Sequence, residues 1–192
     1  MSAQVVEHLQ RRIESLQGAP TRLTVPLHPA LEGLLQLRTG ASYAVDSASL
    51  ALGLAAGASR SGEWVGFAGW GDFGAEAATQ WGIDLRRTVL VPEPGDLWLE
   101  VAAAMVDVLK VVVIKPPTHV DAKSASILDA RLRARSSTLV AWGEWPRVEA
   151  RLSAERVVWS GVGRGRGRLQ HRALRVAVDR GSRRSSHDLR LP

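Results

Sequence analysis

The stretch SYAVDSASLALGLAAGASRSGEWVGFA, residues 42–68, decides the fold class. It predicts a short strand at 42–45, an Ala- and Leu-rich helix at 47–60 and a second strand at 63–68. The alternation continues downstream, with strands expected at 88–91, 111–114 and 137–142 and helices at 75–81, 97–109 and 121–135. Repeated strand–helix alternation is typical of βαβ units on a largely parallel sheet, so we predict an α/β core over residues 42–145.

After Trp145-Pro146 the apolar residues recur every second position, which is typical of antiparallel strands with one wet face. Runs at 156–162 and 172–179 flank the sequence GRGRGR at 163–168. We therefore predict antiparallel strands over 146–179 that form a hairpin with a basic, glycine-rich tip. Residues 180–192 are expected to form a polar, basic tail, and a last strand near Leu189 stays open.

The N-terminal segment 1–18 predicts an amphipathic helix over 3–17, capped by Ser2 and ended by Gly18 and Pro20. Its apolar face would carry Val5, Val6, Leu9, Ile13 and Leu16 and would need a surface to cover it. Residues 19–41, whose first part holds three prolines, are expected to form a linker arm.

Composition excludes several classes of protein. The chain has 192 residues, is 45% hydrophobic and has no cysteine, so we expect one ordinary core and no disulfide, thiolate zinc site or cysteine nucleophile. No apolar run reaches the roughly 18 residues needed to span a bilayer, and charged residues interrupt the N-terminus where a signal peptide would be apolar. These features predict a soluble, cytoplasmic protein without a membrane partner.

The net charge of +6 is concentrated near the C-terminus. From Arg156 onward there are 10 arginines and 2 aspartates, whereas the preceding residues carry a small negative charge. Concentrated positive charge attracts nucleic acid or an acidic protein surface, and the sequence leaves both open. The residues expected to make this contact are Arg164, Arg166, Arg168, Arg172, Arg175, Arg180, Arg183 and Arg184.

Motifs for catalysis are missing from the sequence. No Gly-x-Ser-x-Gly follows a predicted strand, and the five histidines are not spaced for a metal site, so we expect no catalytic residue, metal or cofactor. Of the seven tryptophans, Trp64, Trp142 and Trp159 are expected in the core. Trp70, Trp98 and Trp145 fall at strand ends or loops, where contact with a partner is plausible.

Four segments in order carry a family resemblance: SLALGLAA at 49–56, GEWVGF at 62–67, GIDLRRTVLVP at 82–92 and the aliphatic run at 111–114. Together they resemble the RecA ATPase core in the degenerate form of the ImuA/ImuA′ group of SOS-mutagenesis proteins, over roughly residues 30–180. The resemblance implies a RecA-like three-layer core with a largely parallel central sheet, a C-terminal antiparallel hairpin and a separate N-terminal helix.

The positions of RecA's nucleotide chemistry are substituted in this sequence. A P-loop needs a glycine, a lysine and a magnesium-binding hydroxyl at its end. Here the corresponding residues are Asp46, Ser47 and Ala48, and Lys115 stands where the Walker B aspartate belongs. The catalytic glutamate falls near Gly71. The resemblance therefore implies a pseudo-ATPase, because phosphoryl transfer depends on these groups.

The resemblance also implies partners. Proteins of this group act with ImuB, an inactive Y-family polymerase homologue, and through it with an error-prone C-family polymerase; DNA, RecA and a second copy of the chain are further candidates. The implied role is an adaptor in DNA-damage-induced translesion synthesis. Three alternatives stay open: an α/β domain that never had a P-loop, a DNA-binding accessory protein without a polymerase partner, and an enzyme with an unrecognised nucleotide site using Asp46, Asp72 and His119.

Overall fold

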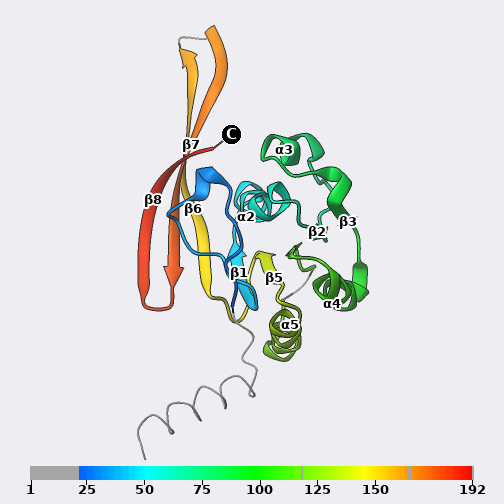
Figure 1. Ribbon diagram of the computed structural model, residues 1–192. Coiled ribbons are helices and arrows are strands. Elements are labelled where there is room, and N and C mark those ends of the chain that lie inside the picture. The colour runs from blue at the N-terminus through cyan, green and yellow to red at the C-terminus, as the bar shows by residue number, and fades with distance from the viewer. Residues whose placement is uncertain (1–21, 118, 164–165, 192) are drawn as a thin grey trace, which may run out of the picture.

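A computed structural model describes residues 22–117, 119–163 and 166–191 (Figure 1). Its eight strands are β1 (Ala41–Val45), β2 (Val65–Ala68), β3 (Thr88–Val91), β4 (Val111–Ile114), β5 (Thr138–Trp142), β6 (Ala150–Gly163), β7 (Arg166–Arg180) and β8 (Arg183–Leu191). The helices are α2 (Ala48–Arg60), α3 (Ala75–Gln80), α4 (Trp98–Val108) and α5 (Ala122–Arg135), with short 3-10 turns η1 (Pro29–Leu31), η2 (Leu85–Arg87) and η3 (Gly95–Leu97).

All eight strands join one sheet in the order β3-β2-β4-β5-β1-β6-β7-β8. The first six in that order pair in parallel, β7 is antiparallel to β6, and β8 is antiparallel to β7. The prediction of a mixed α/β protein with a largely parallel sheet and a C-terminal antiparallel hairpin is therefore confirmed.

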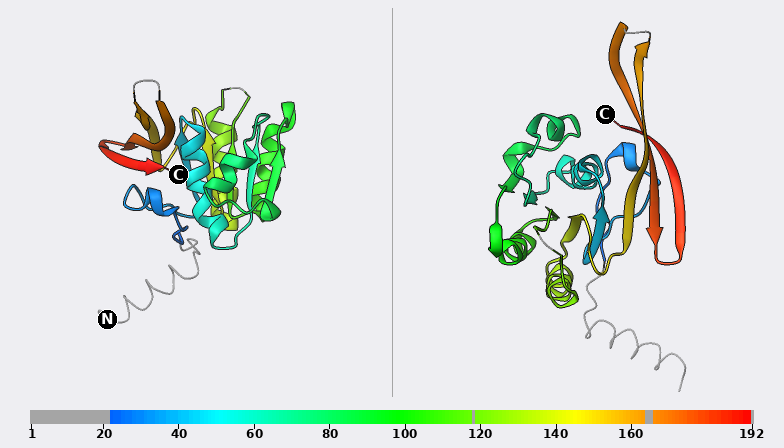
Figure 2. Two further views of the ribbon diagram at one scale, coloured as in Figure 1. Left: turned by 90° about the horizontal axis from the view of Figure 1, so that it is seen from above. Right: turned by 180° about the vertical axis from the view of Figure 1, so that it is seen from behind.

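Helices cover both faces of the parallel part of the sheet (Figures 1 and 2). Helix α2 lies on one face, in a core cluster with Val111 and Val113 of β4, and α4 and α5 lie on the other, in a cluster with Val112 and Ile114. Every residue of β4 is buried, as its aliphatic sequence predicts. Among the described residues, none of the helices combines the length and apolar character needed to cross a membrane.

The segment before β1 is part of the core and not a linker arm. Val25, Leu31, Leu34 and Leu37 are 2% exposed or less, and the Val25 amide donates to the Leu37 carbonyl at 2.8 Å. A Cβ atom on Gly57 of α2 would lie 2.1 Å from the Pro26 carbonyl oxygen, so the glycine permits close packing of this segment on the helix. The expectation of an arm over 19–41 is thus wrong for residues 22–40, because Val25 and the leucines that follow the last proline supply a buried face.

The last part of the chain is also more regular than its polar sequence suggests. Residues 183–191, expected as a tail, form β8, in which Leu189 and Leu191 are the buried residues. The pairing of β8 with β7 ends at Arg172 and Leu191. Beyond that point β6 and β7 pair only with each other, at Ser160 with His171 and Gly163 with Arg166, and project from the body as a two-stranded ribbon (Figures 1 and 2).

Candidate functional site

The carboxyl ends of the parallel strands are where an open α/β sheet usually binds its ligand. Strand β1 ends at Val45 and helix α2 begins at Ala48, so Asp46 and Ser47 are the entire link. The Ser47 hydroxyl caps α2 by accepting from the Leu50 amide at 3.4 Å. Both carboxylate oxygens of Asp46 accept from the Ala154 amide at 3.0 Å, which ties the link to β6. A two-residue link offers no loop of free amides to surround a phosphate.

Lys115 follows β4 at the same edge of the sheet. Its amide donates to the Ala68 carbonyl at 2.9 Å, and its ammonium nitrogen lies 4.3 Å from the ring centre of Trp142. A cation over an indole face is attracted by the ring's electron density. Lys115, which the resemblance puts at the Walker B position, is therefore held on an aromatic ring.

Four aromatic residues pack together at this edge, and we call them the aromatic cluster: Phe67, Trp70, Phe73 and Trp142. The ring centres of Trp70 and Trp142 are 4.5 Å apart, those of Phe67 and Phe73 4.8 Å, and those of Trp70 and Phe73 5.4 Å. Trp70 is 5% exposed. The cluster fills the carboxyl edge with packed rings in a part of the sheet where an ATPase would need space for nucleotide.

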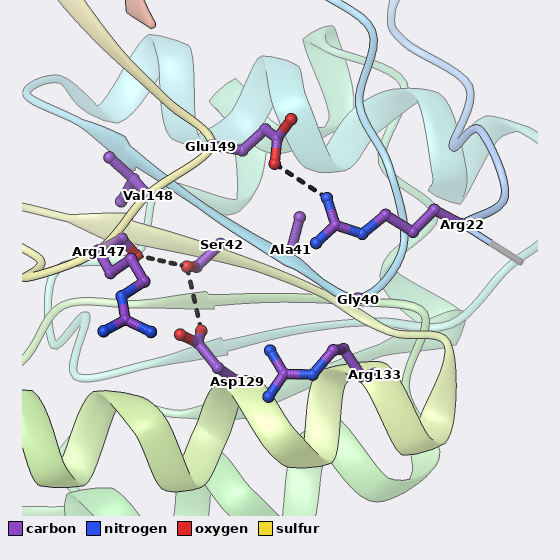
Figure 3. A pocket seen from close by; sticks show the side chains of 9 residues that line it. All are labelled: Arg22, Gly40, Ala41, Ser42, Asp129, Arg133, Arg147, Val148 and Glu149. Atoms are coloured by element: carbon purple, nitrogen blue, oxygen red, sulfur yellow. Dashed lines mark hydrogen bonds and ion pairs between the residues drawn. The ribbon is translucent and has the colours of Figure 1, made fainter. Parts of the chain in front are cut away.

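A pocket lies at the opposite, amino end of β1 (Figure 3), and we call it the β1 pocket. It has a volume of about 110 Å³ and lies between the start of β1, helix α5 and the loop that joins β5 to β6. Its charged and hydroxyl side chains are Arg22, Ser42, Asp129, Arg133, Arg147 and Glu149. Four separate segments of the chain therefore bring polar groups to one place.

Asp129 is the buried acid of the β1 pocket, with 7% of its surface exposed. The Ser42 hydroxyl lies 2.8 Å from the Arg147 carbonyl oxygen and 3.3 Å from Asp129 Oδ1 (Figure 3). Burial raises the pKa of Asp129, and the Ser42 hydrogen bond and the charges of Arg133 and Arg147 offset only part of that rise. At the rim, Arg22 and Glu149 form an ion pair at 3.1 Å.

Comparison with known proteins places this architecture in a family. Residues 29–147 match the family described as MT3502 N-terminal domain, which is more than half of the chain. The chain belongs to the MT3502 N-terminal domain family. It is also 33% identical over 159 residues to the uncharacterized protein Rv3395c of Mycobacterium tuberculosis, covering 79% of this chain and 76% of the relative.

The aromatic cluster and most of the polar residues of the β1 pocket lie within the matched residues. The match at residues 29–147 includes the aromatic cluster, Lys115, and Ser42, Asp129, Arg133 and Arg147 of the β1 pocket. It begins at Pro29, within the segment expected as an arm, and ends before β6. The ribbon lies outside the matched residues.

The structure shows that some of the predicted basic contact residues already have partners within the protein. Three are engaged within the protein: Arg175 pairs with Asp188 at 2.7 Å, Arg184 with Glu155 at 2.6 Å, and Arg180 donates to the Leu34 carbonyl at 3.0 Å. Arg183 is exposed. Arg166, Arg168 and Arg172 lie in β7, and Arg164 lies outside the described residues. Composition alone counts every arginine as available for a partner. It does not show that Asp188 and Glu155 pair with Arg175 and Arg184 in the folded protein.

The predictions for the N-terminal apolar face and for the tryptophans have different outcomes. The apolar face Val5, Val6, Leu9, Ile13 and Leu16 lies outside the described residues. Trp64, expected in the core, is 48% exposed because it precedes β2, whereas Trp70 and Trp145, expected at a contact surface, are 5% and 3% exposed. In the described part of the chain, no group of three His, Asp or Glu side chains is arranged to hold a metal ion.

We expect Asp129→Asn to stabilise the protein at pH 7.5, by an amount on the order of 1 kcal/mol, because asparagine removes a poorly solvated charge. The raised pKa means that the folded protein binds the Asp129 proton more tightly than the unfolded chain does. Protonated Asp129 therefore contributes fully to the free energy of unfolding below the ordinary carboxyl pKa. This contribution is lost as the pH rises through the raised pKa of Asp129. Urea unfolding at pH 7.5 and at pH 4 should therefore give a smaller difference between variant and wild type at the lower pH.

Glu149→Gln is the matched control, because it removes an acidic charge from the exposed rim of the same pocket. Its free energy of unfolding should change by less than about 0.5 kcal/mol at either pH. A clear loss of stability in Asp129→Asn at pH 7.5 would contradict the interpretation of Asp129 as a strained buried acid.

Proposed function

We propose that this chain is a non-catalytic adaptor with a RecA-like core, which binds an ImuB-type inactive Y-family polymerase homologue in a DNA-damage-induced mutagenesis complex. The filled carboxyl edge of the sheet carries the proposal. An ATPase core needs a phosphate loop, a metal-binding acid and space for nucleotide at this edge. Here the edge holds a two-residue link, Lys115 and the aromatic cluster.

The sheet topology supports the RecA-like part of the proposal. In the resemblance, the strands that carry the P-loop, the catalytic glutamate and the Walker B acid are β1, β2 and β4. All three are parallel members of one sheet, with β5 between β1 and β4, so their carboxyl ends lie at the same edge. The substituted positions thus fall where the nucleotide chemistry of such a core would be assembled.

The ribbon supports the adaptor role. It extends past β8 and carries the alternating Gly-Arg sequence at its turn. Beyond Arg172 the two strands of the ribbon pair only with each other, whereas Arg175, Arg180 and Arg184 at its base are engaged in ion pairs or hydrogen bonds. A projecting basic hairpin can reach the phosphates of DNA or an acidic patch on a partner.

Replacing Arg164, Arg166 and Arg168 together by alanine is expected to weaken DNA binding about tenfold or more at 0.1 M salt. Affinity falls as salt rises, and each lost phosphate contact should make the slope of log affinity against log salt less steep by roughly 0.7 to 0.9. Fluorescence anisotropy with single- and double-stranded oligonucleotides across a salt series measures both quantities. The same variant should bind a purified ImuB-type homologue more weakly if the arginines contact protein.

The control variant Arg86→Ala, Lys123→Ala and Arg135→Ala removes the same charge from exposed sites away from the ribbon. It should leave both affinities within about twofold of wild type. DNA binding without any binding of the ImuB-type homologue would favour an accessory DNA-binding protein instead. Wild-type protein that binds neither would sink the adaptor proposal.

A further inference from the structure

The β1 pocket holds two arginines that form no ion pair with a described residue. Arg22 pairs with Glu149, which leaves Arg133 and Arg147 as the remaining cations. Neither guanidinium group has an ion pair or hydrogen bond with another described residue, and in Figure 3 they lie on either side of Asp129. Two free guanidinium groups that face one small cavity suit an anion better than a cation, because each presents several N–H donors.

The position of Arg133 is set by a glycine. Gly40 has φ of +70°, in the left-handed region, and a Cβ atom there would lie 3.3 Å from Cγ and 3.4 Å from Cα of Arg133. The chain at the start of β1 therefore packs directly on the base of the Arg133 side chain. This contact keeps the arginine beside the pocket.

Ser42 and Asp129 form the floor of the pocket. Ser42 has one hydroxyl hydrogen, and the closer acceptor is the Arg147 carbonyl oxygen at 2.8 Å. The same hydroxyl also lies 3.3 Å from Asp129 Oδ1 and donates to it. The Asp129 carboxyl group lies between the two guanidinium groups (Figure 3). One carboxylate can balance only one of the two guanidinium charges, so the pair keeps a positive charge for an anion.

We propose that the β1 pocket is a phosphate-binding site, in which Arg133 and Arg147 hold the anion above Ser42 and Asp129. Its volume of about 110 Å³ is several times the roughly 10–15 Å³ that one water molecule requires, which leaves room for one tetrahedral anion. Arginine forks match the geometry of phosphate oxygens. The site lies at the amino end of β1 and is separate from the filled carboxyl edge, so it does not depend on the adaptor role.

The test is isothermal titration calorimetry of the full chain with sodium phosphate at constant ionic strength. Wild type should bind, and the double variant Arg133→Ala and Arg147→Ala should bind at least tenfold more weakly. Lys123→Ala removes a positive charge from the first turn of α5, the helix that carries Arg133, and should bind as wild type does. Circular dichroism melts of each variant establish that the fold is retained.

A titration with a short single-stranded oligonucleotide identifies the source of the phosphate. If the site binds DNA backbone, the double variant loses affinity for the oligonucleotide and for phosphate together; if it binds a free phosphate compound, only the affinity for phosphate falls. Either result supports the site. Absence of phosphate binding by wild type, or equal binding by wild type and the folded double variant, would overturn it.

Discussion

Gly69→Ala is expected to lower the free energy of unfolding by roughly 3–5 kcal/mol, among the largest effects of any single substitution in this chain. Gly69 has φ of +75°, and a Cβ atom there would lie 2.2 Å from the Lys115 carbonyl oxygen. The left-handed conformation alone costs a non-glycine residue roughly 1–2 kcal/mol. The backbone cannot move to relieve the contact, because the Gly69 amide donates to Val91 and the Lys115 amide to Ala68. Three strands, β3, β2 and β4, are tied together at this point.

Urea unfolding followed by tryptophan fluorescence measures the loss, and two alanine variants separate its causes. Gly71→Ala, with its nearest contact at 3.7 Å, should change stability by less than about 0.5 kcal/mol. Gly95 has φ of +56° and open space around it, so Gly95→Ala reports the backbone cost alone. If Gly69→Ala is no worse than Gly95→Ala, the close approach of Gly69 to Lys115 has no energetic importance.

Trp70→Ala is expected to cost about 3–5 kcal/mol, because it removes the central ring of the aromatic cluster and leaves a cavity. The lost contacts are those with Phe67, Phe73 and Trp142. Trp64→Ala is the matched control: it deletes the same side chain from a site that is 48% exposed and should cost about 1 kcal/mol or less. Chemical unfolding of both variants gives the comparison.

The Trp70→Ala variant also tests the proposal that the carboxyl edge of the sheet does not bind nucleotide. We expect no binding of magnesium-ATP in calorimetry even with the ring removed, because the two-residue link between β1 and α2 still offers no phosphate loop. Binding that appears in Trp70→Ala and not in wild type would show that the ring alone blocks the site. In that case the short link would not be what prevents nucleotide binding.

The parallel core could be predicted from the sequence because its signals are local. The boundaries of β3 and β4 agree with prediction, since each is a short apolar run bounded by turn residues. The full extent of strand β8 could not be predicted from its polar sequence, RRSSHDLRL, because only Leu189 and Leu191 are buried and the rest depends on pairing with β7. Local composition does not report such pairing.

The β1 pocket could not be predicted for a related reason. Its polar residues come from positions 22, 42, 129–133 and 147–149, and no spacing within any one segment resembles a known motif. Asp129 lies among arginines of α5 and has the pattern of an exposed helix. Only the packing of α5 against the start of β1 buries it.

The pairing of β6 has a mechanical consequence. β6 joins β1 through three register pairs, from Tyr43 with Ala150 to Val45 with Leu152, whereas its pairing with β7 runs for most of its length. A partner that pulls on the ribbon along its axis applies a shear force to the boundary between β1 and β6. The hydrogen bonds of the three register pairs then resist the force together. A sideways pull would peel them one after another, so the protein should resist force far better in the first direction than in the second.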